Sequence, residues 1–91
     1  MTEDKFENLA EIFKALAHPL RVKIALGLMK KEECNVSKIV ERTGVPQPTV
    51  SQHLNILKNA GVIKGNRKGN NICYQVENET VIRILSEYSE A

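Results

Sequence analysis

The segment of residues 43–61 constrains the fold most strongly, because it prescribes a turn followed by a helix with two unlike faces. Read as a helix from about Gln47, it places Val50, Leu54 and Leu57 on one side, at the i, i+4, i+7 spacing of a buried stripe. The opposite side has amides and hydroxyls but no Asp or Glu. We therefore predict a helix that packs on a core and presents neutral polar groups outward.

Such a polar face suits the edges of base pairs. Gln52, Asn55 and Asn59 lie on it, with Thr49 and Ser51 on its flanks. Amides and hydroxyls both donate and accept hydrogen bonds, as base edges in a major groove require, whereas a carboxylate would repel the phosphates. A helix face that is only solvated would have a similar composition. The rest of the chain is therefore needed to distinguish a DNA-binding face from a solvated one.

Three further helices are expected before this segment. Apolar residues at helical spacing predict a first helix over about 3–16. Pro19 is typical of a first helical turn and opens a second helix that runs to about Lys30. Asn35 is a good N-cap for a short third helix over about 36–42. The intervening residues, Glu33 to Asn35, have room only for a connecting β-bridge.

After Gly61 the apolar period changes from about 3.6 to about 2. Two strands are predicted over 62–67 and 71–76, joined by a turn at residues 68–70. Asn78 then caps a last helix that runs to about Tyr88. The predicted order is α-α-(β)-α-α-β-β-α, a mainly α fold with a small β-hairpin. We interpret it as a single winged helix-turn-helix domain over 1–91, with the helix-turn-helix at about 36–60 and the wing at about 62–76.

Size favours a dimer. A chain of 91 residues with two Phe, two Tyr and no Trp has little with which to fill a core of its own. The terminal helices, at about 3–16 and 78–89, have apolar stripes that a second copy would cover. The residues expected at this interface are Phe6, Leu9, Phe13, Val81, Ile82, Leu85 and Tyr88.

The net charge of +2 hides an uneven distribution. Residues 14–68 contain eleven lysines and arginines against three glutamates, a surplus of eight positive charges. The two ends together contain eight acids against two basic residues. A basic centre between acidic ends is typical of a protein whose middle meets a polyanion.

Two stretches resemble the ArsR/SmtB family of bacterial and archaeal repressors. One is Phe13-Lys14-Ala15-Leu16-Ala17-His18-Pro19-Leu20-Arg21, and the other is Gln47-Pro48-Thr49-Val50-Ser51-Gln52-His53-Leu54, followed by Leu57, Ala60-Gly61-Val62, Gly69 and Tyr74. The similarity covers roughly residues 9–77. It implies a homodimer, built mainly from the first and last helices, that binds a partly palindromic operator and releases it when an effector binds.

The sensing residues of that family are missing. Many members bind metal or arsenite through a Cys-Val-Cys pattern, where this chain has Asn35-Val36-Ser37. Others use Asp and His pairs on the last helix, and residues 78–91 contain neither. Soft metals require two or more thiolates and zinc about four ligands. We therefore expect no metal at the usual sites of the family and no cofactor.

Cys34 and Cys73 are left without an assigned role. In a winged helix the bridge before the third helix lies beside the second wing strand, so these two residues would meet. A reversible disulfide or persulfide between them would act on the wing and make them a redox pair. The alternative is that both stay reduced and pack as small apolar residues.

We predict that the recognition helix and the wing contact DNA. The N-terminal half of such a helix enters the groove, so Gln47, Thr49, Ser51 and Gln52 should approach bases. We expect Lys64, Arg67 and Lys68 to gather at a hairpin tip with no acid nearby. The full set of expected DNA-binding residues is Gln47, Thr49, Ser51, Gln52, His53, Asn55, Lys58, Lys64, Arg67 and Lys68. His53 is also near the buried stripe and could pack inward, and His18 is expected to be a cap or a surface residue.

Other functions fit less well. A winged helix that only binds proteins would have the same fold, but not the basic centre or the carboxylate-free helix face. An enzyme is disfavoured because the sequence has no nucleophile triad, phosphate-binding loop or paired carboxylates at useful spacing. Neither a membrane span nor a signal peptide is expected, which predicts a cytoplasmic protein.

Overall fold

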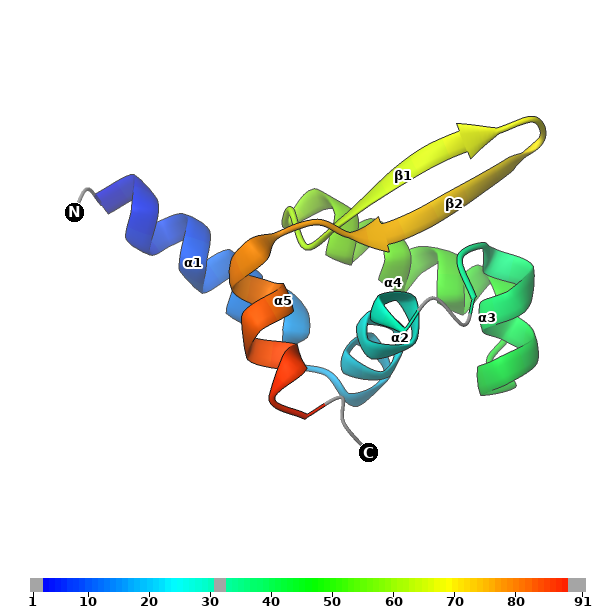
Figure 1. Ribbon diagram of the computed structural model, residues 1–91, viewed down its shortest axis with the longest axis horizontal. Coiled ribbons are helices and arrows are strands. Elements are labelled where there is room, and N and C mark those ends of the chain that lie inside the picture. Colours follow the sequence, from blue (N-terminus) through cyan, green and yellow to red (C-terminus); the bar gives the residue numbers. More distant parts are fainter. Residues whose placement is uncertain (1–2, 31–32, 89–91) are drawn as a thin grey trace.

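The computed structural model describes residues 3–30 and 33–88. Helices and strands follow one another in the predicted order (Figure 1). They are α1 (Glu3–Leu16), α2 (Pro19–Met29), α3 (Val36–Thr43), α4 (Gln47–Asn59), β1 (Ile63–Lys68), β2 (Asn71–Val76) and α5 (Glu79–Ser86). The winged helix-turn-helix fold is confirmed.

Local chemistry sets the helix boundaries. The Nδ1 atom of His18 accepts a hydrogen bond from the backbone N–H of Leu20 (3.1 Å), so His18 is the N-cap of α2. Asn35 and Asn78 cap α3 and α5 in the same way through their side-chain oxygens. Gly44, with φ of +72°, takes the left-handed conformation that ends α3.

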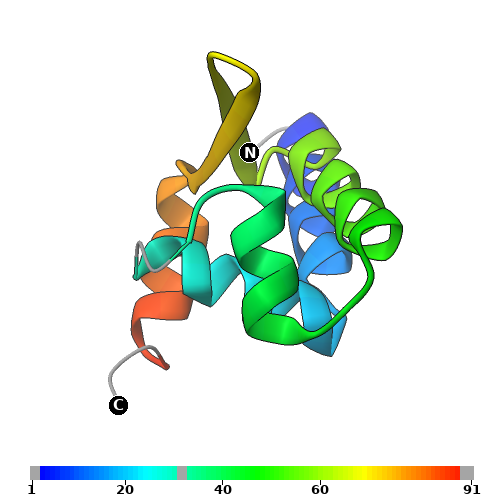
Figure 2. The same cartoon turned by 90° about the vertical axis from the view of Figure 1, so that its right-hand side faces the viewer.

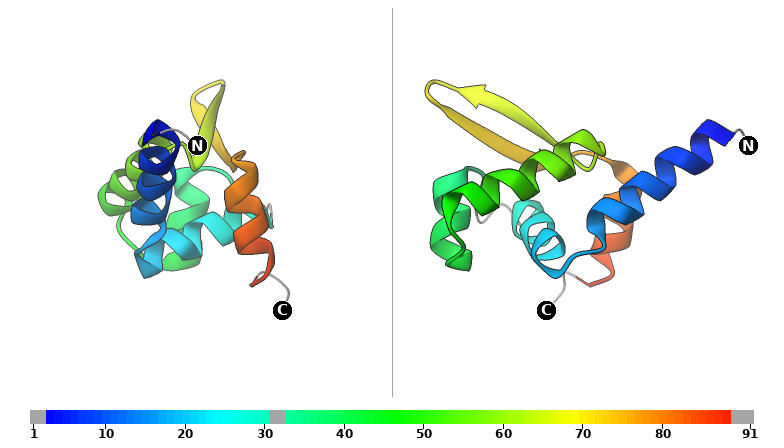
Figure 3. Two further views of the ribbon diagram at one scale, coloured as in Figure 1. Left: turned by 90° about the vertical axis from the view of Figure 1, so that its left-hand side faces the viewer. Right: turned by 180° about the vertical axis from the view of Figure 1, so that it is seen from behind.

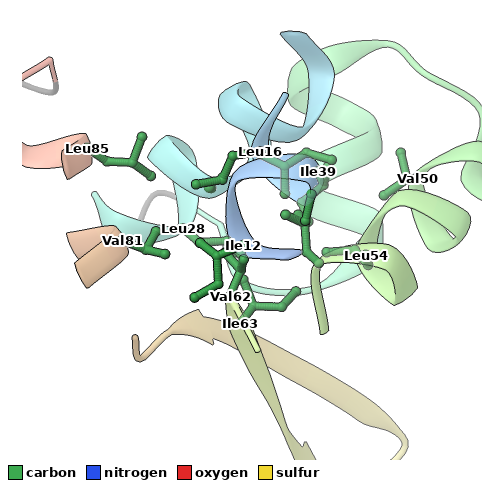
Figure 4. Close-up of a cluster of buried hydrophobic side chains, with 14 residues drawn as sticks. Ile12, Leu16, Leu28, Ile39, Val50, Leu54, Val62, Ile63, Val81 and Leu85 are labelled. Carbon is green, nitrogen blue, oxygen red and sulfur yellow. The ribbon is translucent and has the colours of Figure 1, made fainter. Parts of the chain in front are cut away.

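The core joins all the helices to the base of the hairpin. Its fully buried side chains are contributed by α2, α3, α4, α5 and the start of the wing, and α1 adds its C-terminal half (Figure 4). The members are Ile12, Ala15, Leu16, Ile24, Ala25, Leu28, Ile39, Val50, Leu54, Leu57, Val62, Ile63, Val81 and Leu85. The stripe predicted for α4 is thus buried, and its polar side is directed away from the core.

The wing is a two-stranded antiparallel sheet in which Ile63 pairs with Val76 and Lys68 with Asn71. Gly69, with φ of +65°, forms the tight turn. The right-hand view of Figure 3 shows the hairpin running back over α4, from the C-terminal end of α4 towards the end where α3 and α4 meet. Wing and recognition helix therefore lie on one side of the molecule.

The β-bridge expected at residues 33–35 is reduced to one contact. These residues form a loop without strand geometry, and the backbone N–H of Tyr74 donates to the carbonyl of Cys34 (2.7 Å). Asn35 leaves this loop at once to cap α3, so no room remains for a longer ladder. The loop before α3 nevertheless lies against β2, as predicted.

Helix α1 projects from the body at the end of the molecule opposite α3 (Figure 1). Phe6 and Phe13 are about half exposed, at 50% and 51%, and Leu9 is also exposed. Val81 and Leu85, which were expected at a dimer interface, instead lie in the core of the protomer, at 0% and 5% exposure. The stripe of α5 therefore faces inward, where Val81 and Leu85 join the same core cluster as the buried residues of the other helices.

None of the described helices is both long and apolar enough to cross a membrane.

Candidate nucleic-acid interface

The outer face of α4 is polar and free of acids. Gln47, Gln52, Asn55 and Lys58 are exposed, and Thr49 and Ser51 are half-buried on its flanks. The amide of Gln47 donates to the hydroxyl of Ser51 (3.1 Å), which holds both side chains near the start of the helix. These are hydrogen-bonding groups of both kinds, displayed on one rigid helix.

The start of α4 has no side-chain cap. Pro46 occupies the N-cap position, and its carbonyl accepts from the backbone N–H groups of Thr49 and Val50 (3.0 and 3.1 Å). The first turn contains no acid, and Pro48 removes one donor that would otherwise lack a partner. No carboxylate of the first turn therefore offsets the positive end of the helix dipole.

The wing divides its basic residues between two places. Arg67 and Lys68 lie at the tip, exposed, next to the Gly69 turn. Lys64 lies at the base instead, and its ammonium group is 3.7 Å from a carboxylate oxygen of Glu77. The expected tip cluster without acids is therefore wrong for Lys64, because the antiparallel register brings residue 64 opposite Gln75 and close to Glu77. Both partners are about half exposed, so this pair contributes little to stability.

His53 faces the protein. Its ring is stacked at a tilt on that of His18, with centroids 4.7 Å apart, and its Nδ1 is 3.1 Å from Nη1 of Arg21. Arg21 in turn donates to the carbonyl of Ala15 (2.6 Å). Burial lowers the pKa of His53, and the neighbouring His18 and Arg21 lower it further. This cluster links α1, α2 and α4 and fixes the angle of the recognition helix.

An ion pair that the sequence analysis did not identify anchors α3. The Nε of Arg42 donates to Glu33 (2.7 Å), and its Nη2 donates to the carbonyl of Lys23 in α2 (3.0 Å). The pair packs over Gly27, where a Cβ atom would collide with both side chains. Glu33 is almost fully buried, so losing Arg42 would strand a buried charge. The sequence did not indicate Glu33 as the partner of Arg42, because Arg42 has several acids nearby in the chain.

Cys34 and Cys73 are joined by a disulfide, with their Cα atoms 4.7 Å apart. The bond ties the loop before α3 to the wing strand β2. It therefore links the two parts of the candidate interface, the helix-turn-helix and the wing. Among the described residues, no three His, Cys, Asp or Glu side chains group closely enough to hold a metal ion.

Comparison with known proteins identifies the family. The family model for bacterial regulatory proteins of the arsR family matches residues 18–64. An HTH-type transcriptional regulator of Methanocaldococcus jannaschii, MJ1325, is 39% identical over 87 residues, which are 96% of this chain and 98% of that protein.

Two solved structures extend the similarity to the whole fold. The transcriptional repressor PagR of Bacillus anthracis is 38% identical, with a TM-score of 0.87 over 94% of this chain and 98% of the other. The homodimeric winged helix-turn-helix DNA-binding domain of Mb0332 from Mycobacterium bovis is 30% identical, with a TM-score of 0.81 over 96% and 82%. The chain therefore belongs to the ArsR family, whose members are DNA-binding transcriptional regulators and not enzymes.

Proposed function

We propose that this protein is a cytoplasmic, homodimeric repressor that places one α4 in each half of a partly palindromic operator and releases the DNA on a thiol redox signal. The observation that carries the proposal is the outer face of α4, which is polar, free of acids and flanked by a basic wing. Similarity to PagR, a transcriptional repressor, supports repression as the outcome of binding.

We assign the contacts with bases to the first turns of α4. Gln47, Thr49, Ser51 and Gln52 lie in the half of the helix that enters a major groove in helix-turn-helix proteins. The exposed Asn55 and Lys58 on α4, with the wing residues Lys64, Arg67 and Lys68, are assigned to the phosphate backbone. His53 acts indirectly in this scheme, because its contacts with Arg21 and His18 set the position of α4.

Dimerisation is assigned to α1 together with the end of α5. Phe6, Leu9 and Phe13 expose a contiguous apolar stripe, and Tyr88 is 74% exposed just beyond α5. Ile82, on α5, is half-buried and is included in this assignment. This end of the molecule is remote from α3 and the start of α4, so a second copy there leaves the DNA-binding side open (Figure 1). The homodimeric state of the Mb0332 domain supports a dimer.

The redox signal is assigned to Cys34 and Cys73. Their disulfide holds β2 against the loop before α3, so in the oxidised form the wing and the helix-turn-helix keep one relative position. In the dithiol form the wing can shift to follow the DNA backbone. We therefore expect the dithiol form to bind the operator more tightly.

Fluorescence anisotropy tests the proposal. Labelled DNA from upstream of the protein's own gene is titrated with the dithiol and the disulfide forms, and a scrambled duplex serves as control. The dithiol dimer should bind the upstream DNA with a Kd of about 10 nM or below, in a salt-dependent way. Equal affinity for scrambled DNA would overturn the repressor. Equal affinity of the two redox forms, with specificity intact, would overturn only the signal.

A further inference from the structure

The Cys34–Cys73 disulfide lies in the wall of a groove of about 760 Å³. The groove is bounded by the end of α2, the loop before α3, the start of α3, β2 and α5. Figure 2 shows the end of α2, α5 and the base of the wing gathered on one side of the molecule. A space of this size is enough for a small organic ligand.

Both sulfur-bearing residues are only partly buried, so a small molecule in the groove can reach the disulfide. Met29, Val76 and Ile82 supply an apolar floor, and Asn35 and Gln75 supply amides. This combination of an open disulfide and a lined cavity differs from a structural disulfide sealed inside a core.

The charged side chains that line the groove indicate the charge of its ligand. Glu33 is almost fully buried: one of its carboxylate oxygens accepts from Nε of Arg42, and the other, Oε2, has no hydrogen-bond partner among the described residues. Lys38 is exposed, and no described side chain forms an ion pair with it. Among the described residues, Lys38 therefore remains to attract an anion to the groove.

We propose that this groove binds a low-molecular-weight thiol that carries a carboxylate, with the carboxylate at Lys38 and the sulfur at the Cys34–Cys73 disulfide. The inference rests on the proposed function, since the thiol would restore the DNA-binding dithiol form and its oxidised form would deliver the releasing signal. The ligand is a reactant as well as an effector.

The reaction is thiol–disulfide exchange. The thiolate of the ligand attacks one cysteine sulfur, the protein S–S bond breaks, and the other cysteine leaves as a thiolate and takes up a proton. A second ligand thiolate then attacks the mixed disulfide and releases the oxidised ligand dimer together with the second protein thiol. Two ligand thiols are oxidised for each disulfide reduced. The oxidised ligand re-forms the protein disulfide by the reverse steps.

Exchange rates on the free protein test the proposal. Mercaptoacetate, 2-mercaptoethanol and cysteamine are a carboxylate, a neutral and a cationic thiol of similar size. Each is reacted with the disulfide form, and the loss of the disulfide is followed by mass spectrometry. Each rate is divided by the rate of the same thiol with 2-hydroxyethyl disulfide, a small uncharged disulfide, which removes the thiolate fraction and the intrinsic nucleophilicity of the thiolate. Mercaptoacetate should react about fivefold faster than 2-mercaptoethanol, the effect of one favourable surface charge contact, and cysteamine more slowly than either.

Lysine variants locate the effect. Lys38→Ala should abolish the preference for mercaptoacetate, whereas Lys23→Ala, which removes an exposed lysine of α2 outside the groove, should retain it. Equal rates for the three thiols, or a preference that survives Lys38→Ala, would overturn the proposal. Because no DNA is present, this failure is separate from a failure of the repressor, which the anisotropy titration detects.

Discussion

Helices α1 and α4 are close in length, 14 and 13 residues, and each buries a stripe of three side chains. Their exposed faces differ. Helix α1 exposes Phe6, Leu9 and Phe13 among acids. Helix α4 exposes amides and a lysine with no acid at all, and its one exposed large apolar side chain is Ile56. Exposed aromatics are stabilised by another protein surface, and acid-free amide faces by nucleic acid. In both helices the buried stripe places the helix in the fold, whereas the exposed face indicates the kind of partner that the helix binds.

The largest expected effect is on dimerisation through the exposed face of α1. The double variant Phe6→Glu/Phe13→Glu should weaken dimerisation by about 100-fold or more, because two interface aromatics are replaced by charges. Sedimentation equilibrium measures the dimer constant, and circular dichroism checks that the protomer stays folded. Asn8→Glu adds a charge to α1 without removing an aromatic and is the control. A double variant that still dimerises like the native chain would refute the role given to α1.

The next effect tests base reading by α4. Gln52→Ala should cost about 1–3 kcal/mol on the operator and little on random DNA, because the lost hydrogen bonds are specific to bases. Anisotropy titrations on both duplexes measure the ratio. Asn59→Ala removes an exposed amide at the far end of the same helix and should leave the ratio unchanged. Equal losses on the two duplexes would assign Gln52 to the backbone instead.

Arg67→Ala should have a smaller effect, shared by all sequences. The tip arginine is assigned to a phosphate, so its loss should weaken operator and random DNA alike and reduce the slope of log affinity against log salt by about one. Lys23→Ala, which removes an exposed basic residue of α2 outside the proposed DNA-binding and dimer residues, is the control. A change in sequence preference would show that the wing reads bases.

The smallest effect concerns the inner side of α4. Burial lowers the pKa of His53, so below its usual pKa of 6.5 the unfolded chain takes up a proton that the folded chain resists. The free energy of unfolding should therefore fall slightly between about pH 7.5 and about pH 5.5. Urea unfolding at both values measures it, and His53→Gln should reduce the loss. A native chain that gains stability as the pH falls, with His53→Gln lacking that gain, would contradict this account of His53.

Periodicity and capping residues were enough to predict every helix and both strands. Spacing places Val50, Leu54 and Leu57 on one face, and Asn35 and Asn78 are typical N-caps, so local sequence determines these elements. The proximity of Cys34 and Cys73 also followed, because the topology brings the loop before α3 to β2.

Contacts that depend on tertiary packing were not predictable. The apolar stripe on α5 indicates that another surface covers this helix, but not whether that surface belongs to the same protomer or to a second copy. In the structure, Val81 and Leu85 face the core of the protomer. Arg42 pairs with Glu33 only because Gly27 leaves space for both side chains. Lys64 meets Glu77 through the register of the hairpin, which the sequence fixes only to within about a residue.

Photocrosslinking tests the division of labour between α1 and α4 most directly. A benzoylphenylalanine is placed at Phe13 in one protein and at Asn55 in another, and each is irradiated with operator DNA. The account predicts a protein–protein adduct from position 13 and a protein–DNA adduct from position 55. A DNA adduct from position 13, or only a protein adduct from position 55, would contradict it.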